Sequence, residues 1–326
     1  MLALSTALAG CVSSVLDVDS RGIQPIPARL VSQMKARQMK PSDPILIRIF
    51  KEESELEIWK RDRSGRYALL KTYPMCRWSG KLGPKKYSGD RQAPEGFYQV
   101  SAKMLNPASQ YYLSFNLGFP NRLESALGYT GDALMVHGAC SSAGCYAMTD
   151  DGVAEIYAVA REALRGGQTS FQVQAFPFRM TAQNMVRHRN DPNMPFWKNL
   201  KEGYDIFDVS RRQPMVSACG RRYVFDAQFE GGEPKDPLAA CPPMTIAADP
   251  ALIAKREADA RVIEAAAVEG SEISTHAYAD GGMHPSFRAM LQKSGAQELA
   301  RKTSRTRVPV SRPDSILLAD QDVSAN

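Results

Sequence analysis

The chain has 326 residues and a mass of 35.9 kDa, which is enough for one large core or for two domains. Lys and Arg total 41 against 35 for Asp and Glu, a formal net charge of +6. No segment concentrates this charge strongly enough to follow a phosphate backbone, so we expect no nucleic-acid partner. The mean hydropathy of −0.33, and the lack of any run near the ~18 apolar residues of a spanning helix, exclude a polytopic membrane protein.

The first residues resemble an export signal. Leu2–Gly10 is a short apolar run, too short to span a bilayer but suited to the hydrophobic part of a signal peptide. It ends in Leu8-Ala9-Gly10-Cys11, which resembles the lipobox of bacterial lipoproteins, where the peptide is cut before the Cys and the thiol carries a diacylglycerol. We therefore interpret residues 1–11 as a lipoprotein signal peptide and Cys11 as the lipidation site.

This interpretation places the protein in the bacterial periplasm, with membrane contact only through a lipid anchor. Val12-Ser13 follows Cys11 without an Asp, which by resemblance to lipoprotein sorting favours the outer membrane over the inner one. No Lys or Arg precedes the apolar run, so two alternatives stay open: an ordinary apolar N-terminus, or a start codon assigned too far downstream.

Export changes how the remaining cysteines are interpreted, because disulfides persist outside the cytoplasm. Four of them can pair in three ways: Cys76, Cys140, Cys219 and Cys241. Cys219 and Cys241 lie in one loop-rich stretch and are the favoured pair.

Residues 12–43 contain three prolines and are interpreted as a tether. Residues 44–180 then carry several short strand patterns separated by Gly and Pro turns. The first two, joined by an acidic turn, predict a hairpin. The strand patterns are Pro44–Phe50, Leu56–Lys60, Tyr98–Val100, Ala133–His137 and Phe171–Phe176. We therefore predict a mostly β domain with flanking helices, in the α+β class.

One helix is predicted inside this domain. Apolar residues recur at i, i+3, i+4, i+7 and i+11 from Val153 to Leu164, which is one helical face. Thr149 and Asp150 are candidate N-cap residues, and Gly166-Gly167 ends the pattern.

Residues 181–245 are rich in Asn, Pro and aromatic residues, and we predict helices and loops packed on the β domain. Residues 246–326 are predicted to begin as an exposed helix at Asp249-Pro250 and to continue as a disordered basic tail. The alternative for the tail is weak adhesion to an anionic envelope surface. His188 is interpreted as part of a solvated loop, and His276 and His284 as inert.

The residues best suited to chemistry are His137 and Cys145. A strand delivers His137 at its end, and a loop of small residues delivers Cys145 shortly before the helix. A neighbouring imidazole activates a thiol, and the glycines at 138 and 144 let the backbone turn tightly. The alternatives are a structural thiol, a disulfide with Cys140 or another Cys, and a metal site. A metal is disfavoured because no second CxxC or HxxxH completes four ligands, so we expect neither metal nor cofactor.

His-Gly followed by Ser-Xaa-Gly-Cys resembles the signature of the L,D-transpeptidase (YkuD-type) catalytic domain, a β-sandwich-like fold of bacterial cell-wall enzymes. The stretch 89–98 is similar to a turn and strand of the same family. The stretches 106–121 and 144–150 are similar to its YafK-like murein branch. The resemblance covers about residues 44 to 215.

The resemblance implies a role for each matching residue. Cys145 would attack the amide carbonyl at the third residue of a peptidoglycan stem peptide, usually meso-diaminopimelate. His137 would be the general base, oriented by the carbonyl of Gly138, and the amides of Gly144 and Cys145 would bind the oxyanion. Ser142, Tyr146 and Trp78 are the candidate substrate-binding residues, and Ser142 could also brace the loop by hydrogen bonding.

The thioester would then pass to an amine or to water, in cell-wall biogenesis or remodelling. Ala143 and Ala147 replace a His and an Arg of many members, and the spacing of eight residues between His137 and Cys145 is short. All three departures resemble the YafK-like branch, which includes a type that hydrolyses the bond between an outer-membrane lipoprotein and peptidoglycan. Hydrolysis, with such a lipoprotein as partner, is therefore the first alternative, and a non-catalytic wall-binding module is the second.

Overall fold

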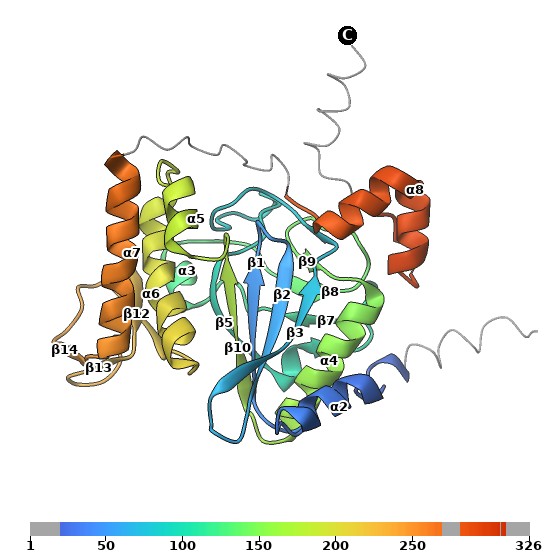
Figure 1. Ribbon diagram of the computed structural model, residues 1–326, viewed down its shortest axis with the longest axis horizontal. Coiled ribbons are helices and arrows are strands. Elements are labelled where there is room, and N and C mark those ends of the chain that lie inside the picture. Colours follow the sequence, from blue (N-terminus) through green and yellow to red (C-terminus); the bar gives the residue numbers. More distant parts are fainter. Residues whose placement is uncertain (1–19, 269–280, 307, 311–326) are drawn as a thin grey trace, which may run out of the picture.

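The computed structural model describes residues 20–268, 281–306 and 308–310, and two five-stranded sheets form its centre (Figure 1). The first sheet has the order β3-β2-β1-β10-β5, and only the β1–β10 pair in it is parallel. Its strands are β1 (Ile45–Phe50), β2 (Glu55–Arg61), β3 (Tyr67–Pro74), β5 (Gly96–Ser101) and β10 (Ser170–Phe176). The predicted hairpin is confirmed as β1 and β2, and β1 is buried along its whole length because it lies inside the sheet.

The second sheet has the order β4-β9-β8-β7-β6, and β8 and β9 are its parallel pair. Its strands are only two or three residues long: β4 (Arg77–Trp78), β6 (Leu105–Asn106), β7 (Ser114–Asn116), β8 (Met135–His137) and β9 (Tyr146–Ala147). Two hairpins complete the β structure: β11 (Val216–Cys219) with β12 (Arg222–Phe225), and β13 (Ala227–Phe229) with β14 (Met244–Ile246).

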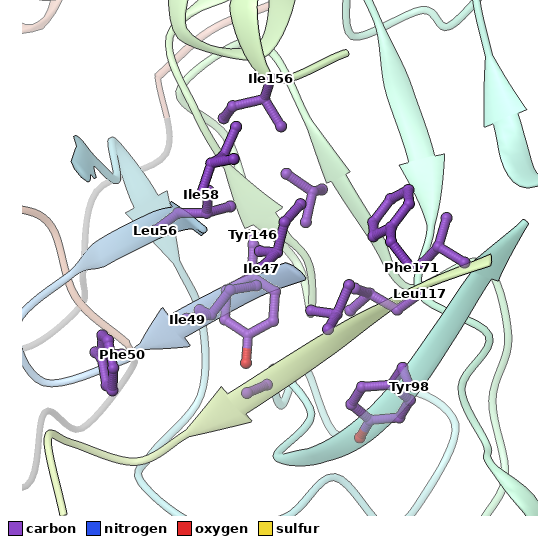
Figure 2. Close-up of a cluster of buried hydrophobic side chains, with 14 of the residues drawn as sticks. Ile47, Ile49, Phe50, Leu56, Ile58, Tyr98, Leu117, Tyr146, Ile156 and Phe171 are labelled. Atoms are coloured by element: carbon purple, nitrogen blue, oxygen red, sulfur yellow. The ribbon is translucent and has the colours of Figure 1, made fainter. Parts of the chain in front are cut away.

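The largest core cluster joins side chains from both sheets and from the helix α4 (Asp150–Arg165). Figure 2 shows the aliphatic side chains of β1 and β2 close to Tyr146 of β9 and Ile156 of α4. Burying each such side chain contributes about 1.5–3 kcal/mol, which fixes the second sheet on the first despite its short strands. The α+β prediction is confirmed.

Helix α4 confirms the predicted amphipathic helix. The Thr149 hydroxyl accepts the N–H of Gly152 at 3.0 Å, and Gly166 caps the C-terminal end. The other helical segments are α2 (Ala28–Ala36), the short 3-10 helix η1 (Ala102–Met104), α3 (Arg122–Ala126), α5 (Ala182–Arg187), α6 (Met194–Ser210), α7 (Pro250–Val268) and α8 (Pro285–Thr303). Helices α5, α6 and α7 stand together on one side of the sheets, with α2 and α4 on the other (Figure 1).

The prediction of a tether over residues 12–43 is wrong for the described part, residues 20–43. Helix α2 buries Leu30 and Met34 in the main core, and the guanidinium of Arg161 on α4 donates to the carbonyl of Gly22 at 2.6 Å. The apolar residues that α2 buries are too few, and too close to prolines, to give a clear helical pattern.

Trp197, Leu200 and Phe225 of the segment 181–245 lie in the main core cluster with side chains of the sheets. His188 is buried and not solvated. Its ring stacks on Phe178 with centroids 4.4 Å apart, and its Nε2 lies 3.2 Å from Glu52. Helix α7 begins at the predicted Asp249-Pro250, and the Asp249 carboxylate accepts the N–H of Ala251.

The prediction of a disordered tail is wrong for residues 281–306. Gly282 and Trp78 exchange backbone hydrogen bonds at the edge of β4, and α8 buries Phe287, Leu291 and Leu299. These side chains cover the disulfide between Cys76 and Cys140. The other disulfide, Cys219–Cys241, confirms the favoured pair.

Candidate active site

Cys145 and His137 are delivered by adjacent parallel strands. The pairs Val136↔Tyr146 and His137↔Ala147 set the register of β8 and β9. Since side chains alternate along a strand, Cys145 and His137 point to the same face of the sheet from diagonal positions. The N–H of Met135 also lies 3.5 Å from the Cys145 sulfur. The fold therefore brings together the two residues that the sequence singled out.

Two glycines allow the loop between these strands to form. A Cβ on Gly138 would lie 2.5 Å from Oδ1 of Asp150 and 2.7 Å from the carbonyl oxygen of Tyr111, so the position requires Gly. Gly144 has a φ of +131°, which residues with a side chain rarely adopt. Both glycines flank the reactive pair, and a side chain at either position would displace the loop.

The imidazole of His137 is 3% exposed, and its Nδ1 lies 2.5 Å from the carbonyl oxygen of Gly138. A carbonyl can only accept, so Nδ1 carries the proton and Nε2 keeps its lone pair. Burial lowers the pKa of His137 to about 4, and the bond to Gly138 acts against that shift. The ring is therefore neutral near pH 7 and can accept a proton at Nε2.

The ring of Tyr111 lies over His137, with centroids 4.6 Å apart and the planes inclined by 40°. Sequence reasoning missed this contact. Tyr111 falls within the stretch 106–121 used for the family resemblance, but nothing in that stretch places it beside His137. Tyr111 is exposed, so its ring lies at the protein surface against the buried imidazole.

Cys145 is the free cysteine of the described residues, and its thiol is partly exposed. Burial raises its pKa, while the N–H of Met135 and the charge of Lys85 lower it. The thiol is therefore protonated at neutral pH, and the resting pair with His137 is uncharged. The alternative of a disulfide to Cys140 is wrong, because Cys140 is bonded to Cys76.

Ser142 fixes the loop from inside. Its Oγ accepts the N–H groups of Gly144 at 3.3 Å and Cys145 at 3.1 Å, and it donates to the Cys145 carbonyl at 2.7 Å. The Oγ of Ser79 lies 3.1 Å away. The sequence interpretation left these amides free for an oxyanion, whereas in the structure they bind Ser142. Since Ser142 is buried, the predicted substrate contact is wrong and the predicted bracing is confirmed.

Trp78 and Tyr146, the other two candidate substrate-binding residues, are buried completely. The indole of Trp78 donates to Ser54 Oγ at 3.0 Å, and the hydroxyl of Tyr146 donates to the carbonyl of Pro94. Both aromatic side chains lie in the main core beneath the site. Their predicted substrate contacts are therefore wrong, because adjacency to a motif does not tell which face of the strand a residue takes.

A buried ion pair holds the neighbouring loop, residues 79–95. Lys51 Nζ lies 2.8 Å from Glu95 and donates to the carbonyls of Gly83 and Ala93 at 3.0 Å each. The indole of Trp197 on α6 donates to the other Glu95 oxygen at 2.8 Å. This loop borders the nucleophile, since the carbonyl of Gln92 lies near Gly144. Sequence reasoning also missed this brace, whose members lie far apart in the chain.

Within the described residues, no group of three or more His, Cys, Asp and Glu side chains is arranged to hold a metal ion. No described helix is long and apolar enough to cross a membrane. Cys11 lies outside the described residues.

Residues 44–281 match the sequence model of the L,D-transpeptidase catalytic domain, YkuD. The chain is 47% identical over 188 residues to "Putative L,D-transpeptidase YafK" of Escherichia coli K12, and the match covers 58% of this chain and 76% of the relative. The same protein of E. coli O157:H7 matches equally.

Among solved structures, the chain resembles the helical cell shape determining protein Pgp2 of Campylobacter jejuni. That match has 16% identity and a TM-score of 0.34, over 58% of this chain and 80% of that one. Bd1075 of Bdellovibrio bacteriovorus matches at 16% identity and a TM-score of 0.31, over 53% of this chain and 76% of that one.

Proposed function

The chain belongs to the L,D-transpeptidase catalytic domain family, and from this premise we propose that it is a cysteine-dependent acyltransferase acting on peptidoglycan stem peptides. Membership alone supports a role as an enzyme of the cell wall, with peptidoglycan as its substrate. The finer proposal rests on one observation: Cys145, the free cysteine of the described residues, shares a sheet face with His137, whose Nε2 keeps its lone pair.

In the first half-reaction, the sulfur of Cys145 attacks the carbonyl carbon of the third stem-peptide residue. Its proton passes to Nε2 of His137, the carbon–nitrogen bond breaks, and the leaving amine takes the proton from His137. Burial keeps the thiol and the imidazole neutral in the free enzyme, so the sulfur must give its proton to Nε2 in the course of the reaction. The product is a thioester on Cys145.

The negative charge that develops on the carbonyl oxygen needs hydrogen-bond donors. In the proposal these are the N–H groups of Gly144 and Cys145, which bind the neutral Ser142 hydroxyl in the free enzyme. An oxyanion is the stronger acceptor, since hydrogen bonds to charged groups are roughly twice as strong as neutral ones. It would draw these donors away from Ser142 as charge develops.

In the second half-reaction an amine or water attacks the thioester carbonyl and receives the acyl group. The carbon–sulfur bond breaks, and the proton of the incoming nucleophile returns to the Cys145 sulfur through His137. Transfer to an amine makes a cross-link, and transfer to water is hydrolysis. The alternative reaction of the same site is hydrolysis of the bond between peptidoglycan and a lipoprotein. Incubating purified muropeptides and lipoprotein-bearing peptidoglycan with the wild type and with Cys145→Ala distinguishes these reactions by mass spectrometry. New diaminopimelate cross-links support transfer, and released lipoprotein or shortened links support hydrolysis.

In either case Cys145→Ala is expected to yield none of the new products. If that variant matches the wild type in every product, the protein is not a cysteine acyltransferase, and a wall-binding module without catalytic activity becomes the better proposal.

We further propose a periplasmic location with a lipid anchor on Cys11 in the outer membrane, based on the lipobox-like Leu8–Cys11. Metabolic labelling with a clickable fatty acid tests this anchor. Equal labelling of the wild type and Cys11→Ser would contradict it.

A further inference from the structure

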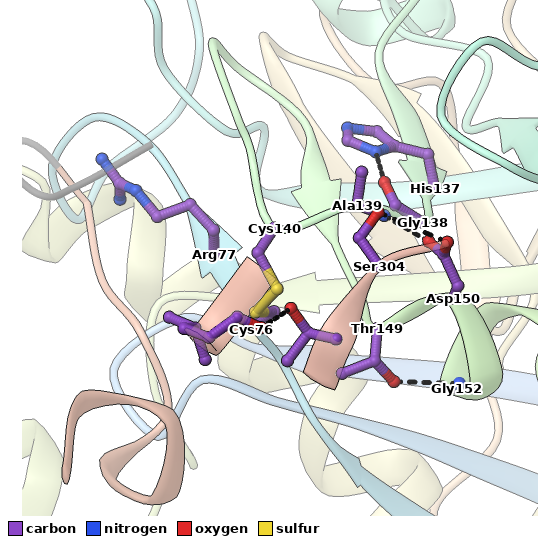
Figure 3. Close-up of a disulfide and its surroundings, with 12 residues drawn as sticks. Cys76, Arg77, His137, Gly138, Ala139, Cys140, Thr149, Asp150, Gly152 and Ser304 are labelled. Atoms are coloured by element: carbon purple, nitrogen blue, oxygen red, sulfur yellow. Dashed lines mark hydrogen bonds between the residues drawn. A yellow bond between two sulfur atoms is a disulfide. The ribbon is translucent and has the colours of Figure 1, made fainter. Parts of the chain in front are cut away.

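Asp150, the first residue of α4, turns its carboxylate toward the loop that follows His137. The residue is only 1% exposed. Its Oδ1 accepts the N–H of Ala139 at 2.8 Å, and it lies so close to Gly138 that a Cβ there would approach it to 2.5 Å. Figure 3 shows the hydrogen bond between Ala139 and the Asp150 carboxylate, together with the bond between His137 and Gly138.

One peptide unit connects His137 to Asp150. The carbonyl of Gly138 and the N–H of Ala139 are the two polar ends of the same planar trans peptide, so they point in opposite directions. The carbonyl faces Nδ1 of His137, and the N–H faces Oδ1 of Asp150. Imidazole, peptide and carboxylate thus form a continuous chain of hydrogen bonds, in which each bond polarises the next.

We propose that Asp150 is a positioning residue of the reaction, which holds His137 in its Nδ1–H tautomer through the peptide between Gly138 and Ala139. The proposal deepens the proposed function, since it rests on His137 acting as the base for Cys145. If this peptide turned over, both hydrogen bonds would break and His137 would lose the acceptor that fixes its proton on Nδ1.

The backbone at Ala139 needs such support. Its φ is +60°, in the left-handed region that Ala seldom adopts. The bond to Asp150 holds its N–H, and the disulfide of Cys140 to Cys76 holds the next residue. Burial raises the pKa of the Asp150 carboxyl, while the N–H groups of Arg305 and Ala139 act against that shift.

The second oxygen of Asp150 is held by the segment that follows α8. Oδ2 accepts the backbone N–H of Arg305 at 2.5 Å and the hydroxyl of Ser304 at 3.4 Å. With donors on both oxygens, the carboxylate has one fixed orientation. Residues more than 150 positions further along the chain therefore complete the support of His137.

The neighbouring Asp151 provides a matched control. It stands in the same first turn of α4 and carries the same charge at the helix N-terminus, where acidic residues are generally stabilising. Its side chain is 77% exposed, and it pairs with the guanidinium of Arg305 at 2.6 Å. If substitution at both positions changes the reactivity of Cys145, the cause is the lost charge at the N-terminus of α4. If only substitution of Asp150 does so, the cause is the lost hydrogen bond to the loop at Ala139.

The test measures the alkylation of Cys145 by iodoacetamide between about pH 5 and 9, read by mass spectrometry of the Cys145 peptide. We expect Asp150→Ala to slow the reaction at pH 7 by about 10-fold or more. In metal sites, mutating the hydrogen-bond partner of a ligating histidine commonly lowers activity by about this factor. Asp150→Asn keeps a hydrogen-bond acceptor but loses the negative charge. Its alkylation rate is expected to lie between those of the wild type and Asp150→Ala. Asp151→Asn should stay within about twofold of the wild type.

A second readout follows the imidazole directly. Labelling with ¹⁵N-histidine gives ring signals from four His residues, and His137→Gln identifies the signal of His137. The wild type should show the Nδ1–H tautomer, and Asp150→Asn a mixture of both tautomers. Ser304→Ala, which removes one donor from the carboxylate, should shift the same signal less.

Each failure has its own signature. If the Asp150 variants are folded, with the Cys76–Cys140 disulfide intact, and keep the wild-type alkylation profile and tautomer, the positioning role is wrong. If His137→Asn alkylates at Cys145 as fast as the wild type, the proposed function is wrong instead. The tautomer measurement still tests the role of Asp150 in that case, because it does not depend on catalysis.

Discussion

The two disulfides of the described residues hold two different regions of the molecule. Cys76–Cys140 joins the residue before the edge strand β4 to the loop that leads to Cys145, across a sequence separation of 64 residues. Cys219–Cys241 spans 22 residues and ties the β11–β12 hairpin to the segment before β14. Both half-cystines of the first bond are fully buried beneath α8, whereas Cys241 is partly exposed.

The first bond lies in the candidate active-site region, and the second supports its own hairpin. Cys140 follows Ala139, whose N–H binds Asp150, so the first disulfide is part of the structure that orients His137. The second disulfide lies in the segment 181–245 and holds the end of β11. It makes no link to the loop 138–145, which the first disulfide holds through Cys140.

The largest expected effect comes from removing each bond without leaving a free thiol. The double variant Cys76→Ser/Cys140→Ser should lose about 2–4 kcal/mol of unfolding free energy, and Cys219→Ser/Cys241→Ser about 1 kcal/mol less, because its loop is shorter. By resemblance to the family, carbapenems should acylate Cys145, and this acylation should be lost in the first variant and kept in the second. Urea unfolding and intact mass measure the two effects.

Equal acylation in both double variants would contradict this distinction. The control is Cys145→Ala, whose mass should not shift with the inhibitor in either background.

A second effect belongs to the active-site region alone and depends on pH. The pKa of His137 is lowered to about 4 by burial, so between about pH 4 and its ordinary value of about 6.5 the unfolded chain binds more protons than the folded one. Its contribution to stability is therefore complete above about pH 6.5 and is lost as the pH falls toward 4, by about 3 kcal/mol in total.

Thermal or urea unfolding of the wild type and His137→Gln across this range measures the contribution as a difference. Taking the difference removes the opposing effect of Glu124, whose pKa burial raises to about 7. If the two proteins lose stability in parallel as the pH falls through this range, His137 is not buried as a neutral ring.

The smallest effect is a difference in the order of reduction. A limiting phosphine reductant should open Cys219–Cys241 first, because Cys241 is partly exposed and a reductant must reach a sulfur. Phe287→Ala should bring the reduction rates of the two disulfides closer together, because it removes a side chain of α8 that packs over Cys76–Cys140. Alkylation and peptide mass spectrometry report the order, and earlier labelling of Cys76 and Cys140 in the wild type would contradict it.

Local patterns predicted much of the fold. The hairpin of β1 and β2, helix α4, and the pair of His137 and Cys145 were all found from periodicity, capping residues or a short motif. The residues that make up each of these patterns lie close together in the sequence, so interactions between near neighbours are enough to determine the structure they form.

Contacts between distant segments could not be predicted in this way. Trp78 and Tyr146 stand in or beside the expected site, but core side chains from distant segments bury both of them. The bonds of Asp150 to Ala139 and Arg305 depend on how α4 and the segment after α8 meet the loop. A helix N-terminus in the sequence gives no sign of them.

The docking of Arg305 on Asp150 has a consequence for biosynthesis. The chain emerges from the ribosome from its N-terminus, so Cys145 and His137 are present long before Arg305 arrives. The Asp150 carboxylate gains its donors on Oδ2 only after residues 304 and 305 have been synthesised. A chain that lacked residues 304 and 305 would keep Cys145 and His137 but would lose two hydrogen-bond donors that fix the Asp150 carboxylate.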